Sequence, residues 1–287
     1  MTVRVFVGFF GLARALDRTI DSIEQHVFAP LLAENIEIVR AAHLNCPSVV
    51  HAPRSGETMV RYTRPDLSRL KLDALTLEEQ SDERVADYIA RIMKIPQYWE
   101  ADEDGNMRRN VIHQMNSLKG LYTLLSGMDP QSFNAIILLR PDLRYIDPLP
   151  IRKFMAQIDP SVRLSTGKMH PLGQALRRGL RGPVDLITPD WHQWNGLNDR
   201  IAIATPQAAA AYLNRIDLLD DYAATHTHFQ SEHLLKFAIE RAGLKNAGTW
   251  VRANRVRTTG EEEGRDTDRK QPWLSAISRP IRIGLQI

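Results

Sequence analysis

The sequence has little cysteine, no long apolar segment and no excess of glycine or proline, and each shortage excludes a class of protein. Cys46 is the only cysteine among the 287 residues, which excludes an intramolecular disulfide and a cysteine-rich zinc site. No apolar run approaches the roughly 20 residues of a membrane-spanning helix. Sixteen glycines and 16 prolines are ordinary numbers, which excludes collagen-like and low-complexity chains.

Several catalytic motifs are also missing. The sequence has no Gly-x-x-x-x-Gly-Lys-Ser/Thr phosphate loop, no Gly-x-Ser-x-Gly elbow and no His-Glu-x-x-His zinc helix. The early segment Gly8-Phe9-Phe10-Gly11 lacks the spacing of a dinucleotide fingerprint. These absences argue against P-loop nucleotidases, serine hydrolases of the elbow type, zinc proteases and NAD enzymes.

The charge of the chain is mildly basic and unevenly spread. The formal net charge is +3, too small to indicate nucleic acid as a partner. Basic residues gather between Asp159 and Asp185 and again after Arg241. Such a run is usually a solvated face, and an acidic substrate or an anionic membrane surface is the alternative. Arg14 interrupts the small-residue pattern after the apolar N-terminus, so we expect a cytoplasmic protein, with peripheral contact to the inner membrane face as an option.

The hydrophobic pattern predicts an α/β fold. A β-branched and aromatic strand (residues 3–7) leads into a glycine turn and then a helix with apolar residues at helical spacing (16–27). Further strands are expected at 36–39, 135–139, 185–188, 201–204 and 249–252, and helices at 67–77, 81–93, 110–126, 207–215 and 229–242. No internal repeat or break in composition divides the chain. We expect one domain over residues 1–255, followed by a charged loop and C-terminal extension over 256–287.

Arg140-Pro141-Asp142 follows the most apolar of these segments. Residues 135–139 are continuously apolar, as expected of a strand that is covered on both faces. In open α/β sheets, ligands bind at the carboxyl ends of the strands. The two charges are therefore placed where a ligand would bind, and a structural Arg–Asp pair that closes the strand end is the alternative.

Two of the five tryptophans lie in the segment between residues 189 and 200. Trp191 and Trp194 alternate there with aspartate, asparagine and arginine. Rings interleaved with hydrogen-bonding groups suit recognition of a sugar or a nucleobase. The alternative is an ordinary loop whose tryptophans anchor it to the core.

Charged residues near expected strand ends and helix starts fit the chemistry of a nucleoside-diphosphate sugar. The diphosphate requires a divalent cation or basic side chains, and the sugar or acceptor hydroxyl requires a carboxylate. Both kinds of group are present, in Arg14, Arg140, Asp142, Asp199, Arg200 and Glu232.

Five segments of the chain resemble bacterial glycosyltransferases of the GT-A type, the nucleotide-diphospho-sugar transferases found with surface-polysaccharide biosynthesis. The segments are Gly11-Leu12-Ala13-Arg14, the helix from Gln114 to Lys119, Arg140-Pro141-Asp142-Leu143, Asn198-Asp199-Arg200 and Ser231-Glu232. Each is short, and together with the strand that leads into the first segment and the helix that the last one opens, they span residues 3 to about 240. The resemblance implies a GT-A-like, Rossmann-type α/β fold: a mostly parallel central sheet flanked by helices, with a C-terminal extension.

The resemblance also implies roles for individual residues. The nucleotide and donor sugar would be bound by Gly8, Gly11, Arg14, Gln114, Ser117, Arg140, Asp142, Trp191, Asn198 and Arg200. Glu232 is the candidate base for the acceptor hydroxyl and Asp190 its rival, while Asp199 lines the donor-sugar pocket as a further catalytic candidate. A base is needed only if the reaction inverts the anomeric centre, which the sequence leaves open.

Arg140-Pro141-Asp142 stands where the family has an Asp-x-Asp motif, so Asp142 would contact a divalent cation, Mn²⁺ or Mg²⁺, or the diphosphate. Arg140 replaces the first aspartate, and a guanidinium could neutralise the phosphates instead. The expected partners are a nucleotide-sugar donor and a glycan or lipid-linked acceptor. The alternatives are a degenerate GT-A module that binds carbohydrate or a partner without turnover, and another transferase that uses the same donor.

Overall fold

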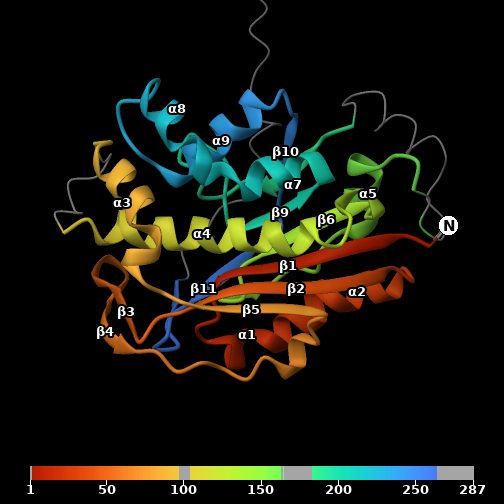
Figure 1. Ribbon diagram of the computed structural model, residues 1–287. Coiled ribbons are helices and arrows are strands. Elements are labelled where there is room, and N and C mark those ends of the chain that lie inside the picture. The colour runs from red at the N-terminus through yellow and green to blue at the C-terminus, as the bar shows by residue number, and fades with distance from the viewer. Residues whose placement is uncertain (1, 97–103, 163, 165–182, 264–287) are drawn as a thin grey trace, which may run out of the picture.

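The computed structural model describes residues 2–96, 104–162, 164 and 183–263, and its centre is a sheet with helices on both faces (Figure 1). Within those residues seven strands form this sheet, in the order β10-β8-β9-β6-β1-β2-β5. They are β1 (Arg4–Leu12), β2 (Glu37–Cys46), β5 (Ala74–Glu79), β6 (Ala135–Leu139), β8 (Leu186–Pro189), β9 (Ile201–Ala204) and β10 (Asn246–Thr249). β9 runs antiparallel to β6 and β8, and the other neighbours pair in parallel. The expected α/β fold with a mostly parallel sheet is confirmed.

The middle of the sheet is buried on both faces. All five residues of β6 are buried, which explains why its sequence shows no alternation between apolar and polar residues. β1 does alternate, but between two cores: Val5, Val7 and Phe9 pack on one face, and Phe6 and Phe10 on the other.

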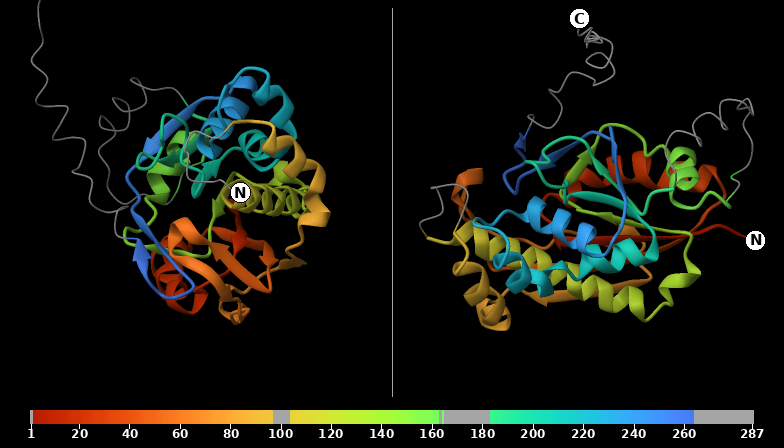
Figure 2. Two further views of the ribbon diagram at one scale, coloured as in Figure 1. Left: turned by 90° about the vertical axis from the view of Figure 1, so that its left-hand side faces the viewer. Right: turned by 90° about the horizontal axis from the view of Figure 1, so that it is seen from above.

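Helices cover the two faces as separate layers. One face carries α1 (Leu16–Ile23), a π-helical turn (Glu24–Phe28), α2 (Ala29–Ala33) and α5 (Ile151–Ile158). The other carries α4 (Asn106–Ser126), α7 (Pro206–Leu213) and α9 (Ser231–Arg241), which lie side by side when seen from above (Figure 2). α3 (Ala86–Met93) and α8 (Leu219–Ala223) pack against the first half of α4 in a third apolar cluster.

Two smaller β structures stand beside the main sheet. β3 (Val49–Ala52) and β4 (Glu57–Arg61) form an antiparallel hairpin. β7 (Leu143–Tyr145), β11 (Ala253–Val256) and β12 (Glu262–Glu263) form a three-stranded sheet in the order β12-β11-β7. The boundary expected after residue 255 falls inside β11, and this strand pairs with β7 directly after the central strand β6.

Some local expectations differ from the structure. The helix expected over 67–77 is wrong: a single 3-10 turn (Ser68–Leu70) is followed by the edge strand β5. Leu75 and Leu77 are two residues apart, as in a strand, and pairing with β2 outweighs the weaker helical spacing. β1 does not stop at Gly8 but continues to Leu12, and the strand expected over 249–252 lies three residues earlier, as β10.

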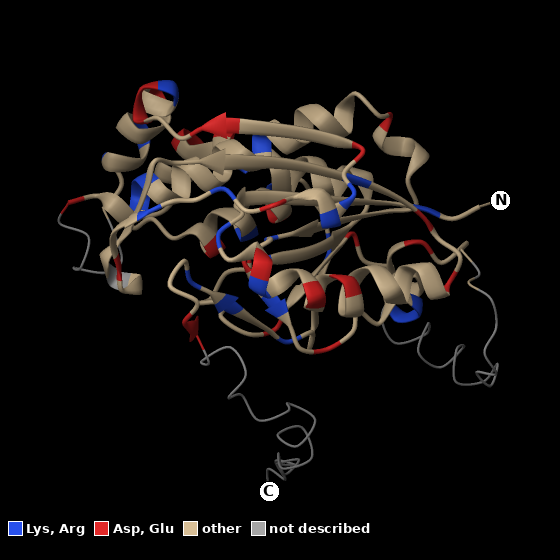
Figure 3. Ribbon diagram, turned by 90° about the horizontal axis from the view of Figure 1, so that it is seen from below, with Lys and Arg blue, Asp and Glu red and all other residues tan. Residues whose placement is uncertain are grey.

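In the part of the chain that the structure describes, no helix combines the length and the apolar character needed to span a bilayer. Viewed from below, basic and acidic residues are interspersed along the ribbon (Figure 3). The basic run between Asp159 and Asp185, from Arg163 to Arg181, lies outside the described residues.

Candidate functional site

A large cavity opens at the edge of the sheet where the parallel strands β1, β2 and β6 end. Its volume is about 700 Å³, within the usual range for small-molecule sites. It is lined from the strand ends by Gly11, Arg14, Asn45 and Arg140, from α4 by Gln114, and from α9 by Glu232. The cavity is therefore at the place where ligands bind in open α/β sheets.

The antiparallel direction of β9 brings a second chain segment to the same edge. Leu139, the last residue of β6, pairs with Ile201, the first residue of β9. The residues before β9 therefore meet those after β6, and Asp199 and Arg200 line the cavity with Arg140. This topology brings together two segments that are 60 residues apart in the sequence.

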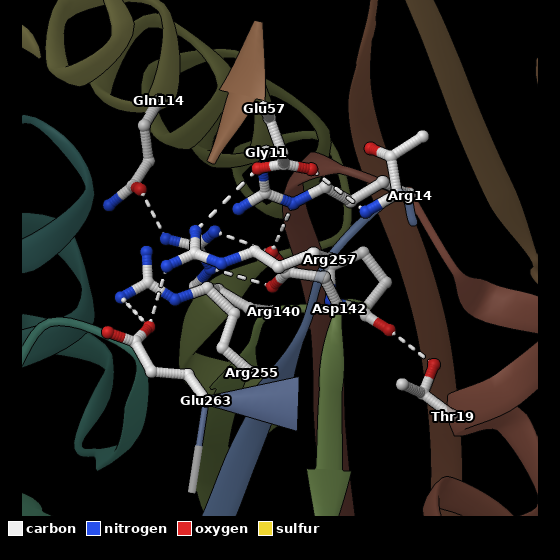
Figure 4. Close-up of polar contacts among 12 residues, drawn as sticks. Gly11, Arg14, Thr19, Glu57, Gln114, Arg140, Asp142, Arg255, Arg257 and Glu263 are labelled. Atoms are coloured by element: carbon white, nitrogen blue, oxygen red, sulfur yellow. Dashed lines mark hydrogen bonds and ion pairs between the residues drawn. The ribbon is translucent and has the colours of Figure 1, made fainter. Parts of the chain in front are cut away.

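Asp142 holds two arginines at the cavity wall. Arg140 donates from Nε to Asp142 Oδ1 at 2.9 Å and from Nη2 to Oδ2 at 2.7 Å, and Arg14 donates from Nε to Oδ2 at 3.0 Å (Figure 4). Asp142 has no exposed surface. Burial alone would raise the pKa of Asp142, but the charges of Arg140 and Arg14 outweigh burial and hold this pKa well below its usual range.

Two further arginines reach the same wall from β11 and the residue after it. Arg257 donates to Glu263 at 2.7 Å, and Arg255 lies 3.1 Å from the same carboxylate. Glu57 of β4 is 1% exposed and accepts from Arg14 Nη1 at 2.6 Å. Burial and the neighbouring guanidinium charges lower the pKa of Arg255 well below its usual value. The wall therefore holds more positive charge than its carboxylates neutralise locally.

Asp199 marks a second, carboxyl-bearing region of the cavity. Its Oδ2 accepts hydrogen bonds from Ser231 Oγ at 2.7 Å, from Gln114 Nε2 at 3.1 Å and from Arg215 Nη2 at 3.3 Å. Gln114 also accepts from Arg140 Nη1 at 2.7 Å through its Oε1. This glutamine of α4 thus connects the arginine wall to the carboxyl region.

Glu232 lies in the first turn of α9 beside Asp199. Desolvation and the negative charge of Asp199 raise the pKa of Glu232 to about 7. Asp199 itself keeps a lowered pKa, because Arg215 and the Ser231 hydroxyl outweigh its burial. Near neutral pH Asp199 is therefore ionised, while Glu232 can gain or lose its proton, the arrangement expected of an acid–base site.

The structure brings seven of the expected site residues to the cavity wall. They are Gly11, Arg14, Gln114, Arg140, Asp199, Arg200 and Glu232. The other six, among them Asp142 behind its two arginines, do not line the cavity.

Gly8 and Ser117 connect the sheet to α4. A β-carbon on Gly8 would lie 2.7 Å from Leu121 Cδ2, so the missing side chain lets α4 pack closely on β1. Ser117 Oγ donates to the His43 carbonyl at 2.5 Å and accepts from Gly11 N at 2.7 Å. Gly11 has a φ of +85°, in the left-handed region that favours glycine, where the chain leaves β1. Gly8 and Ser117 thus position Gly11 rather than line the cavity.

Trp191, Asn198 and Asp190 shape the loop behind the cavity. Trp191 is 1% exposed and donates from Nε1 to the Val251 carbonyl at 2.8 Å, so it anchors the loop to the core. Asn198 donates to the Trp191 carbonyl. Asp190 Oδ1 occupies the space over Gly248 where a β-carbon would sit. The tryptophan of this loop that lines the cavity is Trp194, which is 49% exposed.

Sequence reasoning missed Arg255, Arg257 and Glu263, which line the cavity, together with Ser231. Arginines two residues apart in a strand lie on the same face, so Arg255 and Arg257 carried a usable signal. The strand was expected over 249–252, whereas β11 runs from Ala253 to Val256. No signal in the sequence indicated Glu57, because its contact with Arg14 depends on how the β3–β4 hairpin folds back.

The residues present do not fit a divalent cation at Asp142. The two carboxylate oxygens accept three hydrogen bonds from Arg14 and Arg140, and a cation would have to displace both guanidinium groups. Within the described residues, no cluster of three or more His, Cys, Asp or Glu side chains is arranged to hold a metal ion. Among the described residues that line the cavity, Arg14, Arg140, Arg200, Arg255 and Arg257 carry positive charge that can neutralise an anion.

No protein-family model and no curated protein match the chain. Among solved structures, the chain is similar to mouse xyloside xylosyltransferase 1 in its apo form, with 10% identity, a TM-score of 0.32, and coverage of 87% of this chain and 85% of that chain. It is also similar to a glycosyltransferase involved in the glycosylation of the major capsid of PBCV-1, with 8% identity, a TM-score of 0.35, and coverage of 87% and 81%. Because the identities and TM-scores are this low, the function of the chain has to be inferred from its own cavity.

Proposed function

We propose that the chain is a glycosyltransferase that moves a sugar from a nucleotide-diphosphate donor to a hydroxyl of a glycan or lipid-linked acceptor. One observation carries the proposal: a single cavity of about 700 Å³ combines a wall of arginines with a pair of carboxyl groups whose pKa values are pushed apart. The arginine wall would bind the diphosphate, and the carboxyl pair would act on the sugar and the acceptor.

The arginine wall would bind and stabilise the departing group. When the bond between the sugar and the diphosphate breaks, negative charge grows on the diphosphate, and fixed guanidinium groups stabilise such charge in a partly buried site. Arg14 and Arg140 are already oriented by Asp142. Little reorganisation is then needed as the charge develops.

Glu232 would take the proton of the acceptor hydroxyl. A general base works best when its pKa lies near the operating pH, and the pKa of Glu232 is about 7. Asp199 keeps its negative charge and faces the same space, where it would stabilise positive charge on the sugar ring. These roles belong to an inverting reaction. Asp190 is the weaker candidate for the base because it does not line the cavity.

The proposal is tested by incubating the purified protein with sugar derivatives of UDP, GDP, CDP and TDP. The measurements are the melting temperature and the slow release of free nucleoside diphosphate by hydrolysis. We expect one nucleotide class to raise the melting temperature and to be hydrolysed. Glu232→Gln should cut the rate by about 100-fold or more and leave donor binding within a few-fold of wild type.

Glu240→Gln is the matched control, because Glu240 lies on the same helix and outside the cavity. It should leave the rate unchanged. Absence of binding and turnover with every derivative would refute the proposal. Binding without turnover, unaffected by Glu232→Gln, would instead support a carbohydrate-binding module that lacks transferase activity.

A further inference from the structure

We propose that Arg255 and Arg257 join Arg14 and Arg140 in a metal-independent site for a diphosphate group, in which Asp142 positions guanidinium groups and does not ligate a metal ion. The inference rests on the proposed function, because it names the part of the cavity that would bind the diphosphate of the donor. It goes further by assigning this task to residues near the C-terminal end of the described chain.

The four guanidinium groups converge from three parts of the fold. Arg14 follows β1, Arg140 follows β6, and Arg255 and Arg257 come from β11 and its end. Figure 4 shows their side chains gathered between Asp142 and Glu263. Convergence of this kind is not needed to close a strand end, for which Arg140 and Asp142 alone would suffice.

The carboxylates around these arginines do not accept hydrogen bonds from all of the arginine N–H groups. Within the described residues, Arg255 Nε and Arg257 Nη1 are buried and have no hydrogen-bond partner. Arg257 Nη1 comes no closer to a carboxylate than 3.7 Å, at Glu57. A buried donor without a partner costs free energy, so the surrounding carboxylates leave part of the hydrogen-bonding capacity of Arg255 and Arg257 unmet.

The charge balance also favours an anionic ligand. Within the described residues, Asp142, Glu57 and Glu263 are the carboxylates recorded in contact with these four arginines, so one positive charge remains among these seven side chains. Arg200 lines the cavity beside them and contributes to the repulsion that Arg255 experiences. A diphosphate carries several oxygens and at least two negative charges, which match converging guanidinium groups better than a single carboxylate does.

Asp142 acts through the arginines that it holds, and is therefore a positioning residue. Its oxygens are engaged and its side chain is fully buried. A ligand in the cavity would meet the guanidinium groups, since Arg14 and Arg140 line the cavity and Asp142 does not.

The test measures binding of inorganic pyrophosphate, UDP and UMP by calorimetry in EDTA, and binding of the two nucleotides again in excess MnCl₂. We expect pyrophosphate to bind in EDTA, UDP to bind tighter than UMP, and MnCl₂ to change the UDP dissociation constant less than threefold. Arg255→Gln and Arg257→Gln should each weaken pyrophosphate binding roughly tenfold, the loss of a charge-assisted hydrogen bond. Arg252→Gln is the matched control, because Arg252 pairs with Asp147 beside the same strand and does not line the cavity.

Asp142→Asn separates positioning from metal ligation. Breaking its buried ion pairs should lower the melting temperature by roughly 10 °C. Saturating pyrophosphate in EDTA should then raise the melting temperature of this variant by more than that of the wild type, because the anion replaces the missing counter-charge. A variant that lost only a metal ligand would gain no such extra stabilisation.

Binding that requires MnCl₂, or wild-type affinity in both Arg255→Gln and Arg257→Gln, would overturn the inference. These outcomes are distinct from failure of the proposed function. Pyrophosphate binding in EDTA without turnover of any nucleotide sugar would leave the anion site standing and remove the transferase. Turnover that requires a metal ion would support the transferase and remove the metal-independent anion site.

Discussion

At the scale of single residues, Glu232 gives the cavity a property that can be measured by titration. Its pKa is raised to about 7 by desolvation and by the charge of Asp199. A general base is active when deprotonated, so kcat/KM should rise with pH between about 6 and 8 and level off above. Glu232→Gln should lose this rise along with most of the activity, whereas Glu240→Gln should keep it. A flat profile for the wild type across this range would contradict the role of Glu232.

The site residues that could be predicted from the sequence are those that directly follow a clear strand or helix pattern. Arg140 and Asp142 follow an unbroken apolar strand, and their place at the end of a buried central strand could be predicted from that run alone. The contact of Asp142 with two guanidinium groups could not be predicted in this way, because Arg14 is 128 positions away in the chain. The sequence left two roles open for Trp191 and Trp194, ligand binding and anchoring of the loop. In the structure Trp191 is a buried anchor, and Trp194 lines the cavity.

At the scale of elements, the start of α9 is held in place by a glycine of the loop before β9. A β-carbon on Gly196 would lie 2.2 Å from the backbone carbon and oxygen of Glu232, and Leu197 N donates to the same oxygen at 2.9 Å. Gly196→Ala should therefore displace the first turn of α9. We expect a loss of about 1–3 kcal/mol in the free energy of unfolding and at least a tenfold drop in activity.

Gly127→Ala is the control for this substitution. Gly127 ends α4 with a φ of −70°, and the nearest atom to a new β-carbon is 3.5 Å away. This variant should keep full activity and unfold at the wild-type temperature or slightly above it. Chemical denaturation and initial rates measure both variants. Wild-type behaviour of Gly196→Ala would show that the loop moves aside without cost.

The elements themselves differ in how far the sequence could predict them. Strands such as Ile201–Ala204 match the expected range because their apolar residues form short, well-bounded runs. The segment over 67–77 failed because its leucines are spaced by both two and three residues, and pairing with β2 decided between strand and helix. The helix α4 starts four residues before the expected Asn110. Its first turn has one apolar residue, Met107, and so carries no periodic signal.

At the scale of the whole molecule, stability should decline from the centre of the sheet to its edge. β6 pairs with both β1 and β9 and is fully buried, whereas β5 pairs with β2 alone among the described strands. Amide hydrogen exchange followed by mass spectrometry should find β6 among the slowest segments and β5 exchanging at least tenfold faster. Equal protection of the two strands would mean that β5 has a partner outside the described sheet.

The order of the strands was beyond the sequence for a related reason. Sequence patterns predict that strands exist, but the place of the antiparallel β9 between β6 and β8 depends on pairings across tens of residues. The make-up of the cavity depends on the same pairings, because β9 brings Asp199 and Arg200 to Arg140. The kinds of residue in the site were therefore easier to predict than the partners they meet.

The concentration of guanidinium groups in one cavity has a consequence for handling the protein. Phosphate, sulfate and citrate are common buffer anions, and each presents oxygens of the kind that arginines bind. Preparations purified in such buffers would retain an occupant that competes with added nucleotides, which would make a functional sample look inert. Screening for ligands should therefore start from material exchanged into a chloride buffer of low ionic strength.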